Sequence, residues 1–158
     1  MTPSLDDLNP DFLDLLRALV DSGVEFVVVG AYALSFHGAP RASGDIDIFV
    51  KPSPDNAARV WRALLAFGAP LAAAGVVQSD FEKPDLVYQI GLPPRRVDVL
   101  TSISGVSFEE AWSSRAAATV EGRTVHFIGR EMYLRNKLAA GRPKDLADAA
   151  RLSEAPRR

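Results

Sequence analysis

A continuous apolar run, FVVV at residues 26–29, places the strongest limit on how this chain can fold. The run is short and mostly β-branched, which is typical of a strand buried on both faces. It ends at Gly30, and segments with helical patterns lie on either side of it, at 11–22 and 31–36. A buried strand between helices indicates an α/β fold.

The remaining patterns predict a mixed β-sheet with flanking helices. Helical patterns occupy 55–67, 108–112, 131–140 and 143–152. Strands are predicted at 45–50, 86–92 and 96–100, and a hairpin is predicted to join 119–120 to 124–128. Segments 68–85 and 116–118 carry no clear pattern, and 153–158 is expected to be a frayed end. Because the later strands come in adjacent pairs, the sheet should be mixed.

Length and charge limit the class of protein. The 158 residues favour one domain, with a core at about 10–152. Hydrophobic residues make up 47% of the chain and charged residues 24%, which argues against general disorder. The formal net charge is -2, so the chain lacks the overall basic charge of many nucleic-acid-binding domains.

Several absences in the sequence favour a cytoplasmic protein. The chain has no cysteine, which excludes disulfides, thiolate metal sites and cysteine nucleophiles and fits a reducing compartment. No apolar run approaches the roughly 20 residues that span a bilayer. Residues 1–7 are acidic and lack the basic start of a signal peptide.

The main chemical signal is Asp45-Ile46-Asp47 at the start of a predicted strand. Side chains two apart in a strand point to the same side, so both carboxylates project together and Ile46 faces the core. Two like charges side by side repel and require compensation. Mg²⁺ prefers carboxylate oxygens and substrate phosphates and would supply it. The alternative is a solvated strand edge or a loop cap, because motifs this short also occur by chance.

Asp98 has a similar setting, between β-branched residues in the predicted strand 96–100. A third carboxylate beside the first two would complete a site for one or two cations. Two cations can clamp the attacking and leaving oxygens of an in-line displacement. The competing interpretation is a salt bridge from Asp98 to Arg95, Arg96 or Arg41.

The turn after the buried strand and the loop that follows it offer groups for a triphosphate. Gly30-Ala31 leads into a helix, where backbone N–H groups and the helix N-terminus favour phosphate. The glycine alternatively serves the turn geometry alone. Arg41 offers a planar fork for phosphate or a partner for Asp45. Ser43 offers a hydrogen bond to phosphate or a cap for the turn.

In this order, the features resemble the signature of the polymerase-β-like nucleotidyltransferase superfamily. The segment VVVGAYALSFHGAPRASGDIDIFV at 27–50 has a strand, a glycine turn, a helix and then D-x-D on the next strand. The block NKLAAGRPKDLAD at 136–148 resembles that of the AbiEii-type branch, which includes toxin components of bacterial toxin–antitoxin pairs. The similarity covers most of the chain and implies the nucleotidyltransferase fold.

The resemblance implies roles for individual residues. Asp45, Asp47 and Asp98 would be the catalytic residues and would bind one or two Mg²⁺ ions. The triphosphate would be held by Gly30, Ala31, Arg41, Ser43 and Lys137. The family usually has glycine or serine in place of Ala31, which lacks the hydroxyl that helps to hold the terminal phosphates.

Two further acids lie near the C-terminus. Asp145 and Asp148 are three residues apart on one helical face and are expected to hold Lys144 or Arg151. The alternative is that Asp145 assists proton removal, and the structural role is favoured. Lys144 and Asp145 are therefore assigned a supporting role behind the site. Lys137 lies on a helix whose apolar residues, Met132, Leu134 and Leu138, should face the core. The alternative for Lys137 is an ordinary solvated lysine.

The activity implied is Mg²⁺-dependent transfer of a nucleoside monophosphate from a nucleoside triphosphate to an acceptor hydroxyl on protein or RNA. A toxin–antitoxin role would add a cognate antitoxin or a second copy as partner. Action on tRNA would need a basic groove, for which Arg95, Arg96, Arg115, Arg123 and Arg130 are candidates. The alternative function, favoured by Ala31, is a catalytically weak or inactive module of the same fold that binds nucleotide or protein.

Overall fold

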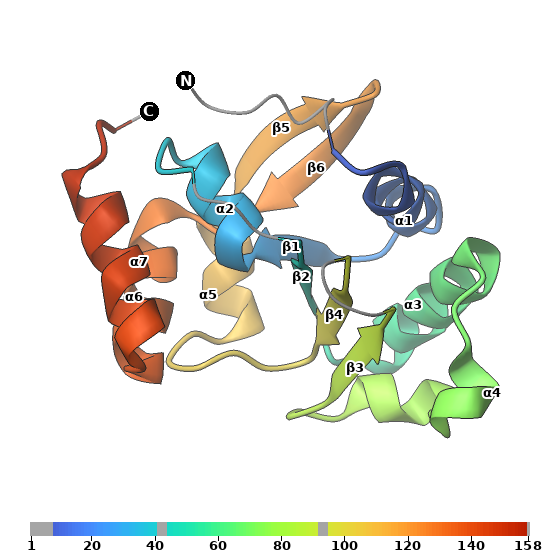
Figure 1. The fold of residues 1–158 in the computed structure, drawn as a ribbon. Helices are drawn as coiled ribbons and strands as arrows, with labels where there is room; N and C mark the ends of the chain where they lie inside the picture. The colour runs from blue at the N-terminus through green and yellow to red at the C-terminus, as the bar shows by residue number, and fades with distance from the viewer. Residues whose placement is uncertain (1–7, 41–43, 92–94, 158) are drawn as a thin grey trace.

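The computed structural model describes residues 8–40, 44–91 and 95–157, and its centre is a six-stranded mixed sheet (Figure 1). The strands are β1 (Phe26–Val29), β2 (Ile46–Val50), β3 (Val87–Ile90), β4 (Val97–Leu100), β5 (Ala116–Val120) and β6 (Arg123–Phe127). They follow the order β3-β4-β2-β1-β6-β5. The β1–β6 and β2–β4 pairs are parallel, and the others are antiparallel. The predicted α/β fold with a mixed sheet is confirmed.

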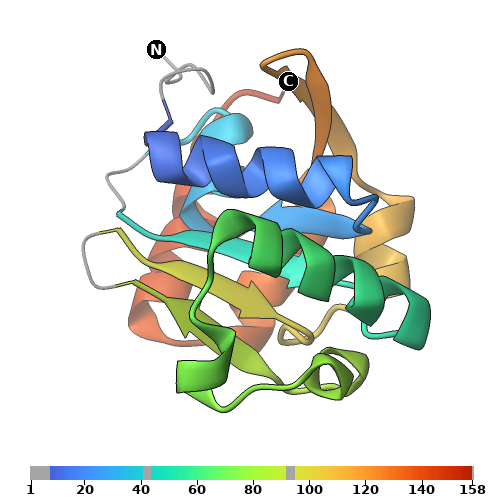
Figure 2. The same ribbon diagram turned by 90° about the vertical axis from the view of Figure 1, so that its right-hand side faces the viewer.

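Helices cover both faces of this sheet. They are α1 (Pro10–Asp21), α2 (Gly30–Phe36), α3 (Pro54–Phe67), α4 (Leu71–Ala74), α5 (Phe108–Ser113), α6 (Arg130–Ala140) and α7 (Pro143–Glu154), with a 3₁₀ helix η2 (Gln78–Glu82). α1 and α3 lie on one face, and α5, α6 and α7 lie on the other (Figures 1 and 2). In the described part of the chain, no helix is both long and apolar enough to cross a membrane.

The residues at the helix starts explain where α1 and α3 begin. Pro10 has the fixed φ that suits a first turn, and the Asn9 side chain accepts a hydrogen bond (2.8 Å) from the N–H of Asp11. In α3, the Ser53 hydroxyl accepts from the N–H of Asn56 (3.3 Å). Both caps satisfy backbone donors that have no partner inside the helix.

Alternation along the central strands separates the apolar core from the polar face of the sheet. All of β1 is buried, as predicted. In β2 and β4, Ile46, Ile48 and Val99 are at most 1% exposed and belong to the core. The residue between each pair of core positions points to the opposite face. This alternation brings Asp47 and Asp98 to the face on which α6 and α7 lie.

The structure differs from the prediction where the sequence pattern is weak. β5 begins at Ala116, because pairing with β6 forms a strand from alanines that carry little hydrophobic contrast. Segment 68–85 contains α4 and η2. α7 continues to Glu154, into the predicted frayed end, because Leu152 is fully buried.

One buried polar side chain, Asn56, connects α3 by hydrogen bonds to the start of β1 and the end of β2. It is fully buried, and its Oδ1 accepts from the N–H of Glu25 (2.8 Å). Its Nδ2 donates to the carbonyl oxygens of Glu25 and Lys51, both at 3.0 Å. A buried amide with this many partners fixes the position of α3, because each backbone group would otherwise lose its partner.

We expect Asn56→Ala to lower the free energy of unfolding by about 2–4 kcal/mol, because several partly buried backbone groups lose their partner. The exposed Arg62→Ala change on the same helix is the control and should cost about 0.5 kcal/mol or less. Urea unfolding followed by circular dichroism measures both. Equal costs for the two variants would contradict the assignment.

Candidate active site

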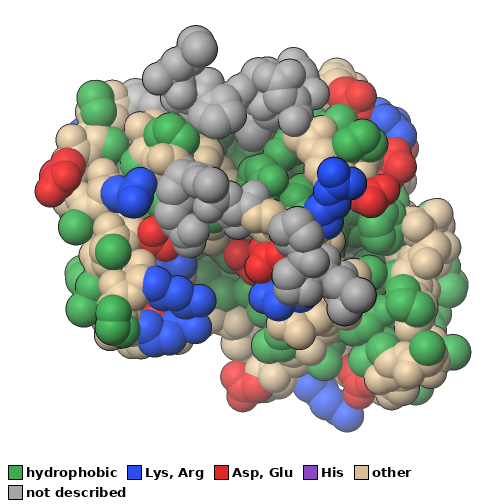
Figure 3. All heavy atoms as spheres, in the orientation of Figure 1, with side chains coloured by type: hydrophobic (Ala, Val, Ile, Leu, Met, Phe, Trp, Pro, Cys, Tyr) green, Lys and Arg blue, Asp and Glu red, His purple; other side chains and the backbone are tan. Residues whose placement is uncertain are grey.

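A cleft of about 760 Å³ opens on the face of the sheet that carries Asp47 and Asp98. Its lining includes Gly30, Ala31, Asp45, Asp47, Asp98, Lys137, Lys144 and Asp145, so the structure brings these predicted site residues together. Arg41 and Ser43 lie outside the described residues. Figure 3 shows acidic side chains in the middle of this face and lysines or arginines toward the α6–α7 side.

The parallel pairing of β2 with β4 sets the distance between the acids. Asp47 is the register partner of Asp98, and the two side chains share a hydrogen bond. Asp45 immediately precedes β2 on the same side of the chain. Asp98 is 8% exposed, so the pair is held largely out of water.

Burial and the neighbouring acid together raise the pKa of Asp47 to about 6. Desolvation of the carboxylate is the largest cause, and the charge of Asp98 and its hydrogen bond follow. The positive charge of Lys137 acts in the opposite direction. A cation at this pair would stabilise the ionised form of both carboxylates.

Arg96 bridges two of the three acids. Its Nε donates to Asp98 Oδ1 (3.0 Å), and its Nη2 lies 3.2 Å from Asp45 Oδ2. Its backbone N–H also donates to Asp45 Oδ1 (3.3 Å). The salt bridge proposed as the competing interpretation of Asp98 therefore exists, and Arg96 forms it. The same salt bridge holds Asp45 near Asp98.

Gly30 forms the floor of the cleft beside Asp47. Its φ of +67° lies in the left-handed region that favours glycine. A Cβ at this position would overlap Asp47 Oδ2 and would lie 3.1 Å from Asp47 Cγ. Glycine is thus required both by the backbone and by the carboxylate that it contacts.

Lys137 extends from α6 between the acids of α7 and the sheet. Its side chain is 12% exposed, which excludes the alternative of an ordinary solvated lysine. The Nζ lies 3.4 Å from Asp145 Oδ1 and 4.0 Å from Asp148 Oδ2. It also lies 5.5 Å from the ring centre of the buried Tyr133, one helical turn earlier.

Asp145 has other partners than those expected. Its carboxylate binds Arg142 through Nε (2.6 Å) and Nη2 (3.2 Å), in addition to Lys137. This fork lowers the pKa of Asp145, the side-chain hydrogen bond from Arg142 being the largest cause. Asp145 and Asp148 were expected to hold Lys144 or Arg151, but their ion pairs in the described part of the chain are with Lys137 and, for Asp145, also with Arg142. The reason is that α7 turns both acids inward toward α6.

Sequence reasoning missed several residues of the cleft. Gln89 lies opposite Asp98 on β3, and Arg142 and Arg151 line the cleft from the α7 side. Alternation along the predicted strand 86–92 would have placed Gln89 on the polar face. The expectation that Leu138 faces the core is wrong, since it is 62% exposed while Tyr133 and Lys137 turn inward.

The donor chemistry of the acids fits a hard divalent cation. Carboxylate oxygens are the ligands that Mg²⁺ prefers, and burial together with the neighbouring Asp98 raises the pKa of Asp47. Within residues 8–40, 44–91 and 95–157, no three His, Asp or Glu side chains are arranged to hold one metal ion. The geometry explains this, because Asp45 and Asp98 point to the guanidinium of Arg96.

Solved structures with the same fold are nucleotidyltransferases or resemble them. A protein from Thermotoga maritima with a provisional nucleotidyltransferase assignment has a TM-score of 0.53 at 17% identity, over 89% of this chain and 91% of that one. The lincosamide antibiotic adenylyltransferase LnuA, solved with lincomycin bound, has a TM-score of 0.55 at 14% identity, over 93% of this chain and 97% of that one. An antigenic nucleotidyltransferase-like protein from Paracoccidioides brasiliensis has a TM-score of 0.52 at 18% identity, over 92% of this chain and 77% of that one.

A comparison with curated protein sequences gives no significant match. The family comparison is specific, because the profile of the AbiEii nucleotidyl transferase toxin of type IV toxin–antitoxin systems matches residues 14–156. That span contains the whole sheet and every described residue of the cleft. The chain therefore belongs to the AbiEii nucleotidyltransferase toxin family.

Proposed function

We propose that this protein transfers a nucleoside monophosphate from a nucleoside triphosphate to an acceptor hydroxyl in a Mg²⁺-dependent reaction. The observation that carries the proposal is the Asp47–Asp98 pair on two parallel strands, facing a cleft whose other wall is cationic. Paired carboxylates whose repulsion is only partly offset by nearby cations suit a metal-bound triphosphate, and the lysine and arginines opposite suit its phosphates.

Each acid has a proposed role. Asp45, Asp47 and Asp98 would hold one or two Mg²⁺ ions, which when bound would neutralise the charge that develops on the triphosphate. The acceptor oxygen would attack the α-phosphorus, the bond to pyrophosphate would break, and the hydroxyl proton would pass to Asp98. This role is supported by the position of Asp98 in the cleft lining and by its pairing with strands on both sides.

The phosphates would lie between the floor of the cleft and α6. Lys137 is the main candidate, because it lines the cleft and its positive charge acts on Asp47, against the rise in the pKa of that acid. Gly30 and Ala31 line the floor of the cleft. Arg41 and Ser43 are retained as proposals from the sequence. Asp145 would position Lys137, and Lys144 would attract the triphosphate at the cleft mouth.

Ala31 favours the second candidate, a module of the same fold that binds nucleotide or protein and transfers little or nothing. The fold comparison weighs against the need for an extra domain, because LnuA is described as lincomycin-bound and 97% of its chain is covered. We therefore keep transfer as the proposal. The acceptor would be a protein or an RNA such as tRNA, and the reaction would take place in the cytoplasm. One domain would suffice for this transfer. A cognate antitoxin or a second copy would be the protein partner.

Asp98→Asn is expected to lower transfer at least about a hundredfold, because both a cation ligand and the proton acceptor are lost. Triphosphate affinity should change less. Transfer of label from an α-labelled triphosphate in cell extract and calorimetry with each nucleotide measure the two effects. Asp55→Asn, an exposed acid on α3 across the sheet, is the control. Comparable transfer by Asp98→Asn and wild type would defeat the assignment, and binding without transfer by wild type would support the module.

The raised pKa of Asp47 gives a pH-dependent prediction. The folded state binds this proton more tightly than the unfolded chain, so the contribution of Asp47 to stability is greatest below about 4 and falls as pH rises through about 6. Asp47→Asn mimics the protonated form. In EDTA it should exceed wild type by about 1–3 kcal/mol at pH 8 and match it at pH 4. Denaturant unfolding across this range provides the measurement, and a difference independent of pH would contradict the prediction.

Ala31→Ser should strengthen binding of a nucleoside triphosphate about two- to tenfold, because a hydroxyl at this cleft position would add a hydrogen bond to a charged phosphate. The affinity for the monophosphate should change little. Calorimetry with both nucleotides in Mg²⁺ tests this. Equal effects on the two nucleotides would place the terminal phosphates elsewhere.

A further inference from the structure

Arg96 occupies the space between acids that the proposed function assigns to a cation. One guanidinium meets Asp98 through Nε at 3.0 Å and Asp45 through Nη2 at 3.2 Å. The planar fork of arginine allows two carboxylates to share it in this way, with separate nitrogens directed to each. Arg96 thus supplies positive charge to both Asp45 and Asp98 in this structure.

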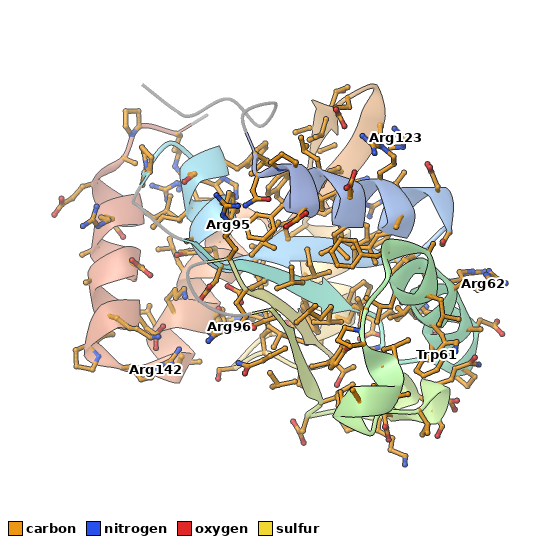
Figure 4. The ribbon with its side chains drawn as sticks, turned by 45° about the vertical axis from the view of Figure 1, so that its right-hand side comes forward. Trp61, Arg62, Arg95, Arg96, Arg123 and Arg142 are labelled. Carbon is orange, nitrogen blue, oxygen red and sulfur yellow. The ribbon has the colours of Figure 1, made fainter. Side chains whose placement is uncertain are left out.

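The position of Arg96 in the chain explains why it reaches both acids. It immediately precedes β4 and lies two residues before Asp98, so its side chain projects on the same side of the sheet. Its carbonyl accepts from the N–H of Ile46 (3.0 Å), which continues the β2–β4 pairing past the strand end and brings Asp45 alongside. Figure 4 shows Arg95 and Arg96 extending in opposite directions, Arg96 on the side of Arg142.

The guanidinium and a divalent cation would compete for the same oxygens. Asp98 Oδ1 and Asp45 Oδ2 are both taken by Arg96. A cation held by Asp45, Asp47 and Asp98 together needs oxygens from each acid, and a positive guanidinium would repel it at that distance. Arg96 can leave, because its side chain is 29% exposed and lines the open cleft.

We propose that Arg96 is an internal counter-ion, a positioning residue that holds Asp45 near Asp98 before metal binding and is displaced by the divalent cation. This inference rests on the proposed function, since it concerns the same cation. Arg96 keeps the acids close together at a lower electrostatic cost. It also weakens metal binding, because the cation must first break two ion pairs.

The test is calorimetric titration of Mg²⁺ alone into wild type, Arg96→Gln, Arg96→Lys and Arg95→Gln. Arg96→Gln removes the competing charge and should bind Mg²⁺ about tenfold more tightly than wild type, which corresponds to ~1.4 kcal/mol. Arg96→Lys should lie between them, because an ammonium keeps the charge and lacks the planar fork. Arg95→Gln removes an equal charge from a neighbouring exposed position and should equal wild type.

Thermal unfolding gives a second readout that does not depend on activity. Without metal, Arg96→Gln should melt below wild type because its acids lose their counter-ion, and Mg²⁺ should raise its midpoint more than that of wild type. If Arg96→Gln does not fold, the unfolding midpoints of Arg96→Lys and wild type are compared instead. In wild type, the Nε–H resonance of Arg96 should shift on addition of Mg²⁺, as the hydrogen bond to Asp98 breaks.

The outcomes separate this inference from the function on which it rests. If wild type binds Mg²⁺ and the Arg96 variants bind it no more tightly, the counter-ion role is overturned and the metal-dependent function stands. If no variant binds Mg²⁺, the metal-dependent function falls and the counter-ion role falls with it. Equal tightening by Arg95→Gln would show a general charge effect and would also overturn the specific role of Arg96.

Discussion

The parallel pairing of β2 with β4 is the constraint on which the rest of the site depends. It sets Asp47 beside Asp98, although 50 residues of chain separate them. Ile46, Ile48 and Val99, buried on the other face, hold the two strands in register, so the hydrophobic core stabilises the contact between the acids. A shift of either strand by one residue would turn its acid into the core, which gives the site its rigidity.

The cost of this arrangement is visible in the charges around it. Burial and like charge raise the pKa of Asp47, Arg96 joins Asp45 to Asp98, and Lys137 approaches from α6. Groups that are expensive to bury without compensation gather at functional sites more often than elsewhere. Here the protein's own cations reduce the repulsion in part, and the remainder favours a positively charged ligand.

Local sequence patterns predicted most helices and strands, and they predicted that Asp45 and Asp47 lie together in the site. Alternation placed Asp45 and Asp47 together, and it needed no knowledge of the sheet. Asp98 was proposed as the third acid from its similar strand setting and from the family resemblance, but its strand partner depends on sheet order, which a local pattern does not contain. The partners of Asp145 were predicted from spacing along one helix, whereas the actual partners include Lys137 on α6. Such contacts depend on how two helices pack.

The double fork from Arg142 to Asp145 has a consequence for the neighbouring helix pair. Asp145 is 1% exposed and is satisfied by Arg142 through two nitrogens and a backbone N–H. If a phosphate drew the ammonium of Lys137 away, this acid would still be neutralised, and α6 and α7 would keep their packing. Lys137 can therefore turn toward a bound phosphate without leaving Asp145 uncompensated between α6 and α7.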